Sequence, residues 1–349
     1  SGISISNTIV RNYNAILRID NTTQNGIEVT AGTFDNKNGG EVYIGEIGNV
    51  GGNAILMNSG QGLLNQSCSL IKATKPIYYS STPSGTNNGI IIENAGGNSR
   101  IQTNNGVIQN LGGGSFNITN NNGILSESAD EVFWTGCGDT QWSNADNWHT
   151  GAVPTTSSDV IIPNATNAPV IPGGPTVRAN SLVIESGATL TNNGGFRITS
   201  PSTGDLRIKS GGTLQGDGTY DIGGDWINDG SFQAGTSTVY LYGTTQIKGS
   251  SQTDFNSLIF LGGTFSLETP ISVSNFLALV INSTLDLNGY DVTLSANASI
   301  GGENVSNYIY STAGGVVKTT QILNAPTSVN PGNIGVTITS SANLGSTTI

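Results

Sequence analysis

Short apolar clusters, separated by glycine and asparagine, recur along the whole chain. The clusters are rich in Ile, Val, Leu and Thr, and a typical one reads Leu-Val-Ile-Glu-Ser-Gly-Ala-Thr-Leu over residues 182–190. These residue types favour β-strands. Ala, Glu, Lys, Arg and Gln never gather into a window long enough for a helix. The pattern therefore predicts an all-β protein of short strands joined by tight turns.

The second half of the chain repeats itself. Residues 182–190 return 24 residues later as Leu-Arg-Ile-Lys-Ser-Gly-Gly-Thr-Leu over residues 206–214, and weaker echoes end at Phe265, Leu285 and Ile300. About 20 to 25 residues make one coil of a solenoid. One coil cannot bury its own inward row of side chains, whereas a stack of coils buries a continuous one.

In the first half, Asn-Gly followed by Ile or Val recurs. Copies begin at Asn88, Asn105 and Asn122, 17 residues apart, and less regular copies begin at Asn25 and Asn53. Gly and Asn suit corners because they reach positive φ. Asn-Gly also marks hairpins, which is the alternative. We predict a parallel β-helix (β-solenoid), with two stacked or consecutive solenoid segments joined by a Trp-rich module.

The segment between these repeats has a different composition. Residues 131–175 hold three of the four Trp residues and the single His. We therefore expect a β-helix-like segment over 1–130, a Trp-rich connecting module over 131–175 and a solenoid repeat segment over 176–349. Because the chain ends on an apolar, strand-like run without a cap, we expect the last segment to be truncated.

Charge narrows the classes of partner. The formal net charge is −11 and only 12 residues are Lys or Arg, so the chain lacks the basic surface that nucleic acids require. An anionic membrane is disfavoured for the same reason. No apolar run reaches about 18 residues, so no membrane insertion is expected in this segment. Hydrophobic residues still reach 35%, which argues against disorder despite 49 Gly.

The Trp-rich segment carries a family resemblance. Its motifs are Phe133-Trp134-Thr135-Gly136, Trp142-Ser143, Asn147-Trp148, Val153-Pro154 and the Asp-Val-Ile-Ile-Pro run at 159–163. They resemble a module of very large surface proteins of Bacteroidota, including gliding-motility adhesins and other cargo of the type IX secretion system. Residues 224–232 and 238–243 are similar to a repeat that follows it there. Residues 1–130 show only a generic likeness to pectate-lyase-like β-helices.

The resemblance implies an extracellular or cell-surface location and no catalytic residue. The partners it implies are surface polysaccharide or other cells, together with the export and anchoring machinery. The C-terminal sorting domain of such proteins is not visible in this sequence.

Two groups of residues are candidate sites. Trp134, Trp142 and Trp148 are a candidate platform for glycan stacking, against the alternative that they form the core of a loop-rich module. Four aspartates recur every four residues and are candidate Ca²⁺ ligands, namely Asp217, Asp221, Asp225 and Asp229. A Ca²⁺ site needs several converging oxygens. The alternative is solvated aspartates at solenoid corners, and no other cofactor is expected.

Signs of catalysis are weak. His149 stands alone without a nucleophile motif, so a packed or exposed loop histidine is the preferred interpretation. Acids and bases do not recur at coil spacing, as a hydrolase with paired carboxylates would need. Cys68 and Cys137 are interpreted as two buried thiols, with one disulfide as the alternative.

We therefore predict a structural or adhesive segment of a large secreted or cell-surface bacterial protein, without catalysis. The alternative is a carbohydrate-binding or carbohydrate-active β-helix, similar to a polysaccharide lyase or glycosidase. Exposed, coplanar Trp rings would favour glycan binding, and buried rings would argue against it.

Overall fold

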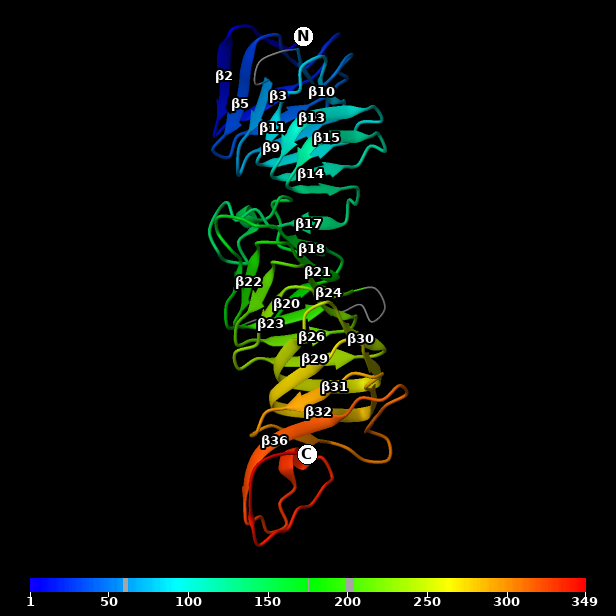
Figure 1. Ribbon diagram of the computed structural model, residues 1–349. Coiled ribbons are helices and arrows are strands. Elements are labelled where there is room, and N and C mark those ends of the chain that lie inside the picture. Colours follow the sequence, from blue (N-terminus) through cyan, green and yellow to red (C-terminus); the bar gives the residue numbers. More distant parts are fainter. Residues whose placement is uncertain (59–61, 175, 199–203) are drawn as a thin grey trace. The chain divides into compact units, whose positions relative to one another are not determined.

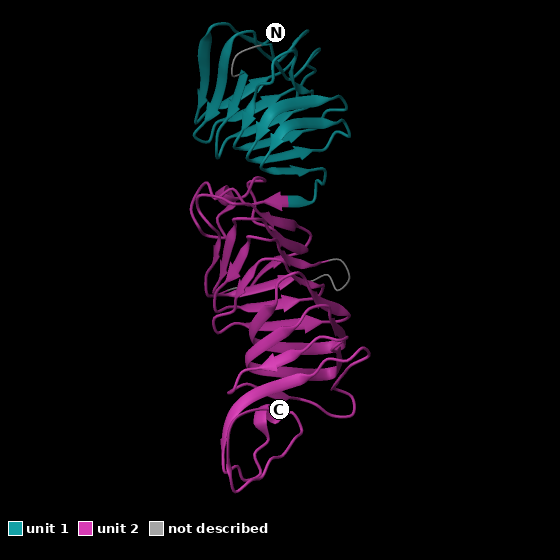
Figure 2. Ribbon diagram, viewed as in Figure 1, with its two compact units in different colours: residues 1–131 teal, residues 132–349 magenta. Residues whose placement is uncertain are grey.

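A computed structural model describes residues 1–58, 62–174, 176–198 and 204–349, and nearly every element in it is a β-strand (Figure 1). The strands stack in parallel into a β-solenoid of about 15 turns, which confirms the predicted all-β parallel β-helix. The chain divides into two compact units, residues 1–131 and 132–349 (Figure 2). Helical structure in the described ranges is confined to two short 3-10 turns, η1 (Ala145–Asn147) and η2 (Pro331–Asn333).

The first unit forms three faces, each built from equivalent strands of successive coils. One face stacks β1 (Ile3–Ile5), β4 (Ile27–Val29), β7 (Ile55–Met57), β10 (Ile77–Tyr79), β13 (Ser99–Asn104) and β15 (Phe116–Asn121). The second stacks β2 (Thr8–Tyr13), β5 (Gly32–Lys37), β8 (Gly62–Asn65) and β11 (Thr86–Asn87), which also pairs with β13. The third stacks β3 (Ile16–Ile19), β6 (Glu41–Ile44), β9 (Leu70–Ala73), β12 (Ile90–Glu93), β14 (Val107–Asn110) and β16 (Ile124–Ser126).

The 17-residue repeat of the first unit is confirmed by its register. Ile90 pairs with Val107, which pairs with Ile124, and both pairings are parallel. The hairpin alternative for these Asn-Gly pairs is therefore wrong. The irregular early copies lie on another face, where Ile27 pairs with Ile55.

Positive φ, the expected reason for glycine at corners, is confirmed at Gly187 and Gly211 of the 24-residue repeat but not at the Asn-Gly corners of the first unit. Gly89, Gly106 and Gly123 do not have φ in the left-handed region. Glycine is needed there because the corners of successive coils touch. A Cβ on Gly106 would lie 2.1 Å from the carbonyl oxygen of Gly89, and one on Gly123 would lie 2.1 Å from that of Gly106.

The second unit is also built on three faces. One stacks β17 (Glu131–Phe133), β18 (Asp159–Ile162), β21 (Ser181–Ile184), β24 (Leu206–Ile208), β27 (Trp226–Asn228) and β30 (Thr245–Lys248). Another stacks β19 (Val170–Ile171), β22 (Thr189–Asn192), β25 (Thr213–Gln215) and β28 (Ser231–Gln233). The third stacks β20 (Thr176–Ala179), β23 (Gly195–Ile198), β26 (Thr219–Ile222) and β29 (Thr238–Tyr242).

Each of the next two strands is long enough to run across more than one face of the solenoid. They are β31 (Thr253–Leu267) and β32 (Ile271–Asp286). Residues 257–261 of β31 pair with β29, and residues 265–267 pair with β30. The last strands are β33 (Val292–Leu294), β34 (Ser299–Gly301), β35 (Tyr308–Tyr310), β36 (Val317–Asn324) and β37 (Asn343–Thr348), of which the last pairs antiparallel with β36.

The 24-residue repeat of the second unit is confirmed, because Leu182 pairs with Leu206 and Leu190 pairs with Leu214. Phe265 and Leu285, which end two of the weaker repeats, also pair with each other on neighbouring coils. The prediction that Ile300 continues this repeat is wrong, because Ile300 pairs with Leu277 on another face. Ile300 lies only 15 positions after Leu285, which is too few for a complete coil of this unit.

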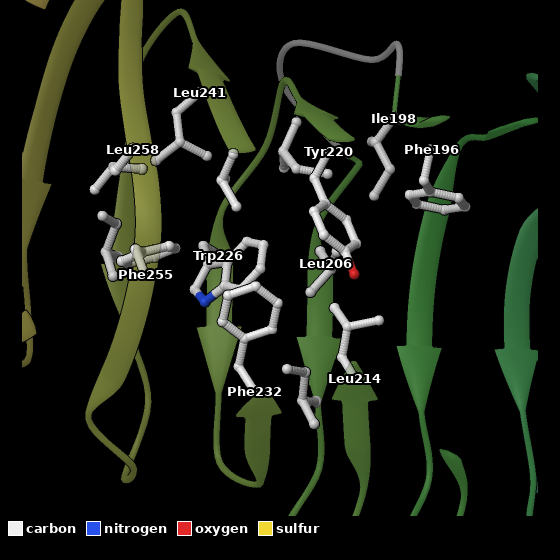
Figure 3. Packing of buried hydrophobic residues seen from close by; sticks show 14 of the residues in the cluster. Phe196, Ile198, Leu206, Leu214, Tyr220, Trp226, Phe232, Leu241, Phe255 and Leu258 are labelled. Carbon is white, nitrogen blue, oxygen red and sulfur yellow. The ribbon is translucent and has the colours of Figure 1, made fainter. Parts of the chain in front are cut away.

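Each unit has its own apolar core. In the second unit, Tyr220 of β26, Trp226 of β27, Phe232 of β28 and Phe255 of β31 meet edge to face or at a tilt (Figure 3). The Trp226 and Phe232 ring centroids lie 4.8 Å apart at 75°. The Trp226 indole also donates a hydrogen bond to the Thr253 hydroxyl at 3.2 Å, so its one polar atom is satisfied inside the core.

Candidate functional site

The three Trp residues of the candidate glycan site form one cluster. The ring centroids of Trp134 and Trp148 are 5.0 Å apart, and those of Trp142 and Trp148 are 4.7 Å apart, both edge to face. Their exposed fractions are 1%, 0% and 2% for Trp134, Trp142 and Trp148. The Trp148 indole donates to the Trp142 carbonyl at 2.9 Å. None of the three rings offers a face to solvent, so the structure does not support sugar stacking on them.

The Trp cluster instead covers one end of the second unit's core. The Trp134 amide donates to the Ile161 carbonyl of β18 at 3.0 Å, and the Trp142 amide donates to the Val170 carbonyl of β19 at 3.1 Å. The segment thus lies as a partial coil on the first complete one. Solenoid ends need such caps, because an open end exposes the apolar interior. We call residues 132–148 the Trp cap.

A buried asparagine shapes the Trp cap. Asn147 is 0% exposed, and its Oδ1 accepts hydrogen bonds from the amides of Gly138 at 2.8 Å and Asp139 at 2.9 Å. Its Nδ2 donates to the Asp139 carboxylate at 2.8 Å and to the Gln141 carbonyl at 2.9 Å. The Gln141 amide and the Asn147 amide group both lower the pKa of Asp139. The sequence reading missed this role, although the Asn147-Trp148 pair marked the position.

His149 also serves the cap. Its Nδ1 accepts a hydrogen bond from the Phe133 amide at 2.9 Å, and the two rings lie 5.1 Å apart in an edge arrangement. The side chain therefore fixes the backbone of β17 beside the Trp cluster.

The four candidate Ca²⁺ ligands do not converge. Asp217 accepts from the Thr236 amide at 2.8 Å, and Asp221 pairs with Arg197. Over residues 1–58, 62–174, 176–198 and 204–349, no group of three or more His, Cys, Asp or Glu side chains is placed to hold a metal. The spacing of four residues spreads these side chains along successive strands and corners rather than around one point.

Each of these aspartates instead joins neighbouring coils. Asp229 accepts from the Ser250 amide of the next coil at 3.0 Å, while its other oxygen accepts from Arg207 at 2.8 Å. Asp225 accepts from the Gln246 amide at 2.8 Å.

The same contact recurs further along the second unit. We call these residues the cross-coil aspartates: Asp205, Asp217, Asp225, Asp229, Asp286 and Asp291, each accepting a backbone amide of the next coil. The amide and hydroxyl of Ser250, with the Arg207 guanidinium, lower the pKa of Asp229. Lys318 and the Val316 amide lower that of Asp291. Both carboxylates are therefore held in their charged form by groups of neighbouring coils.

The first unit joins its coils by a different device, which the sequence reading missed. We call it the asparagine ladder, and its members are Asn12, Asn36, Asn65, Asn87, Asn104 and Asn121. Each Nδ2 donates to the Oδ1 of the next member, at 2.8 to 3.0 Å. Asn36, Asn65, Asn87 and Asn104 are 0% exposed. A fully satisfied buried network of this kind fixes the register of successive coils.

The two cysteines correct another expectation. Neither Cys68 nor Cys137 is a free thiol, since both are disulfide-bonded, and Cys68 lies at an exposed position. The preferred interpretation as two buried thiols is therefore wrong.

Comparison with known proteins gives one match. Residues 133–219 match the family model of a domain of unknown function, DUF8693. The match covers about a quarter of the chain, from the Trp cap to the start of β26. No curated protein and no solved structure gives a significant match. Within the described ranges, none of the helical segments has the length and apolar character for crossing a membrane.

Proposed function

We propose that the chain is a structural and adhesive segment of a large cell-surface protein. The observation that carries this proposal is the continuous joining of coils by side chains as well as backbone. In the first unit, the asparagine ladder runs through six coils. In the second unit, the cross-coil aspartates join successive coils at the surface. A β-solenoid fits a structural role.

The proposed mechanical role follows from the geometry of a solenoid. Each coil contacts only its neighbours, so deforming one unit requires breaking a whole coil-to-coil interface at once. Backbone ladders, a packed inward row and polar side-chain bonds all cross that interface. Each unit should therefore hold a binding surface at a fixed spacing.

The cellular setting of the proposal rests on the resemblance and on charge. Residues 133–163, which begin in the Trp cap, contain the motifs that resemble modules of large Bacteroidota surface proteins. The net charge of −11 suits a surface that stays soluble outside a cell. On this proposal the chain is exported by the type IX system, contacts surface polysaccharide or other cells, and carries out no catalysis.

Adhesion can be tested with the chain coupled to fluorescent beads. Beads carrying the chain should attach to Bacteroidota cells or to their isolated surface polysaccharide. Beads carrying an acidic globular protein of similar net charge serve as the control. Equal attachment of both kinds of bead would refute the adhesive role.

Catalysis is tested separately. The chain is incubated with a panel of acidic and neutral polysaccharides, and new reducing ends and unsaturated products are measured. We expect neither. Product formation would favour the carbohydrate-active alternative over the structural one.

A further inference from the structure

A groove of about 370 Å³ lies on the first face of the first unit. It is lined by Tyr78, Tyr79, Asn98, Arg100, Asn117 and Thr119, together with Ile118. These residues come from β10, β13, β15 and the turn that precedes β13. The volume falls in the range of small-molecule sites. The lining is mostly polar and aromatic, so an apolar ligand would not suit it.

The groove lies where the solenoid narrows. Tyr78 pairs with Arg100 on one face, and Thr86 pairs with Thr103 on the next. Seven residues separate Tyr78 from Thr86, but only two separate Arg100 from Thr103. The later coil therefore lacks a corner loop of five residues. The Tyr79 hydroxyl extends over this step and contacts the Thr119 hydroxyl, 40 positions later in the chain, at 3.4 Å.

Arg100 is held in the groove by the two tyrosines. Its guanidinium carbon lies 4.1 Å from the Tyr79 ring centroid and 5.3 Å from that of Tyr78. One nitrogen donates to the Tyr78 hydroxyl at 3.3 Å. Cation–π contacts and this bond fix the orientation of the guanidinium without neutralising its charge.

Among the other arginines, Arg11, Arg197 and Arg207 have carboxylate partners, whereas no ion pair is found for Arg18 and Arg178 in the described residues. Arg11 pairs with Asp35 at 3.3 Å, and Arg207 pairs with Asp229 at 2.8 Å. Arg100 has no carboxylate within ion-pair distance among the residues described. A guanidinium carries five N–H donors in a fork that matches a carboxylate. Most of the Arg100 donors are therefore available to a ligand.

Amide groups flank this cation. Asn98 uses its Oδ1 to accept from the Ser115 hydroxyl at 2.8 Å, which leaves its Nδ2 for other acceptors. Asn117 lies next to Arg100 in the register of β13 and β15, at an exposed position. Neutral donors and acceptors of this kind suit sugar hydroxyl groups.

We propose that this groove binds a carboxylate-bearing sugar unit of an acidic polysaccharide, with the carboxylate on Arg100. This inference rests on the proposed adhesive function and names its ligand class. The single cation suits one carboxylate for each sugar unit, whereas a nucleic acid would need a wider basic surface. The open form of the groove suits a unit within a polymer.

The test is calorimetric titration of the full chain with short oligogalacturonates and oligomannuronates. The matched ligand control is the methyl-esterified oligogalacturonate, which keeps the ring and hydroxyl groups but has no charge. We expect at least one acidic oligosaccharide to bind. Arg100→Ala should weaken that binding roughly 10- to 100-fold, as expected for a hydrogen-bonded charge, and the ester should bind as weakly. Arg100→Lys should restore only part of it, because lysine lacks the fork.

Arg178→Ala is the matched protein control, because Arg178 is an exposed arginine on β20 of the second unit. It should bind like the unsubstituted chain, and thermal unfolding should show that both variants are folded. Absence of binding by every acidic oligosaccharide would overturn the proposal. So would equal binding by the Arg100→Ala variant or by the ester. If Arg100→Ala beads still attach to cells as well as before, the groove proposal fails while the adhesive function stands.

Discussion

At the scale of single residues, Glu93 is a carboxyl group inside the first unit. It ends β12 and is only 1% exposed. The Ser99 hydroxyl and the Ile77 amide both donate to it, the latter at 3.3 Å. Burial nevertheless dominates and raises the pKa of Glu93 to about 7. The folded chain therefore prefers the protonated carboxyl group at pH values where the unfolded chain ionises it.

The raised pKa of Glu93 predicts a pH dependence with a definite sign. Its contribution to stability is fully present below pH 4.5, its ordinary pKa, and is lost as pH rises to about 7. The loss is about 3 kcal/mol for a shift of this size. Urea unfolding at pH 5 and pH 8 measures it. Glu93→Gln, of similar volume, should remove most of this difference, and an unchanged difference would contradict the assignment.

The asparagine ladder gives a second prediction at this scale. Asn87→Ala should destabilise the first unit by about 2 kcal/mol, because buried partners on Asn65, Asn104 and Val107 lose a hydrogen bond. Asn105→Ala is the matched control. Asn105 makes the same amide bonds to Asn88 and Asn122, but at an exposed position. Its loss should cost less than about 1 kcal/mol, and equal urea midpoints for the two variants would refute a special role for burial.

At the scale of elements, coil length decides what the sequence reveals. Neighbouring coils of equal length repeat visibly, which is why the 24-residue and 17-residue repeats were predictable. The asparagine ladder was hidden because its members are separated by 24, 29, 22, 17 and 17 residues. Corner loops of different length break the sequence period but leave the stacking intact. The groove at Arg100 was missed for the same reason, since it arises from a lost corner loop.

The acidic run of the second unit shows another limit. The spacing of four residues between Asp217 and the aspartates that follow it suggested that they share one Ca²⁺ site. Because the strands are short and joined by corners, this spacing places each aspartate against a different residue of a neighbouring coil. The sequence alone identifies the carboxylates, but only the register of the coils decides what they contact.

The Trp cap predicts an element-scale effect on stability. Trp142→Ala should destabilise the second unit by about 3 to 5 kcal/mol, because a fully buried ring is removed from the end of the core. Ile322→Ala is a control in the same unit, since Ile322 is 82% exposed on β36. It should change the urea midpoint little. A Trp142 variant of unchanged stability would contradict the capping role.

At the scale of the whole molecule, the two units have separate cores. The apolar cluster of the first unit and that of the second share no residue. The second unit is covered at both ends of its core. The Trp cap lies at one end, and β36 turns away from the stack at the other to pair antiparallel with β37. There the Asn333 side chain donates to the Ile300 carbonyl at 2.8 Å, and Ile334 packs against the core.

A solenoid with its own core and covered ends should fold without its neighbour. We therefore expect residues 132–349, produced alone, to unfold cooperatively and to show the same amide hydrogen-exchange protection as in the full chain. Removing the Trp cap, by starting at residue 155, should abolish the cooperative transition, because β18 and β19 would then expose the apolar end. Protection that persists without the cap would show that the coils alone suffice. Loss of protection in residues 132–349 would show instead that the second unit depends on the first.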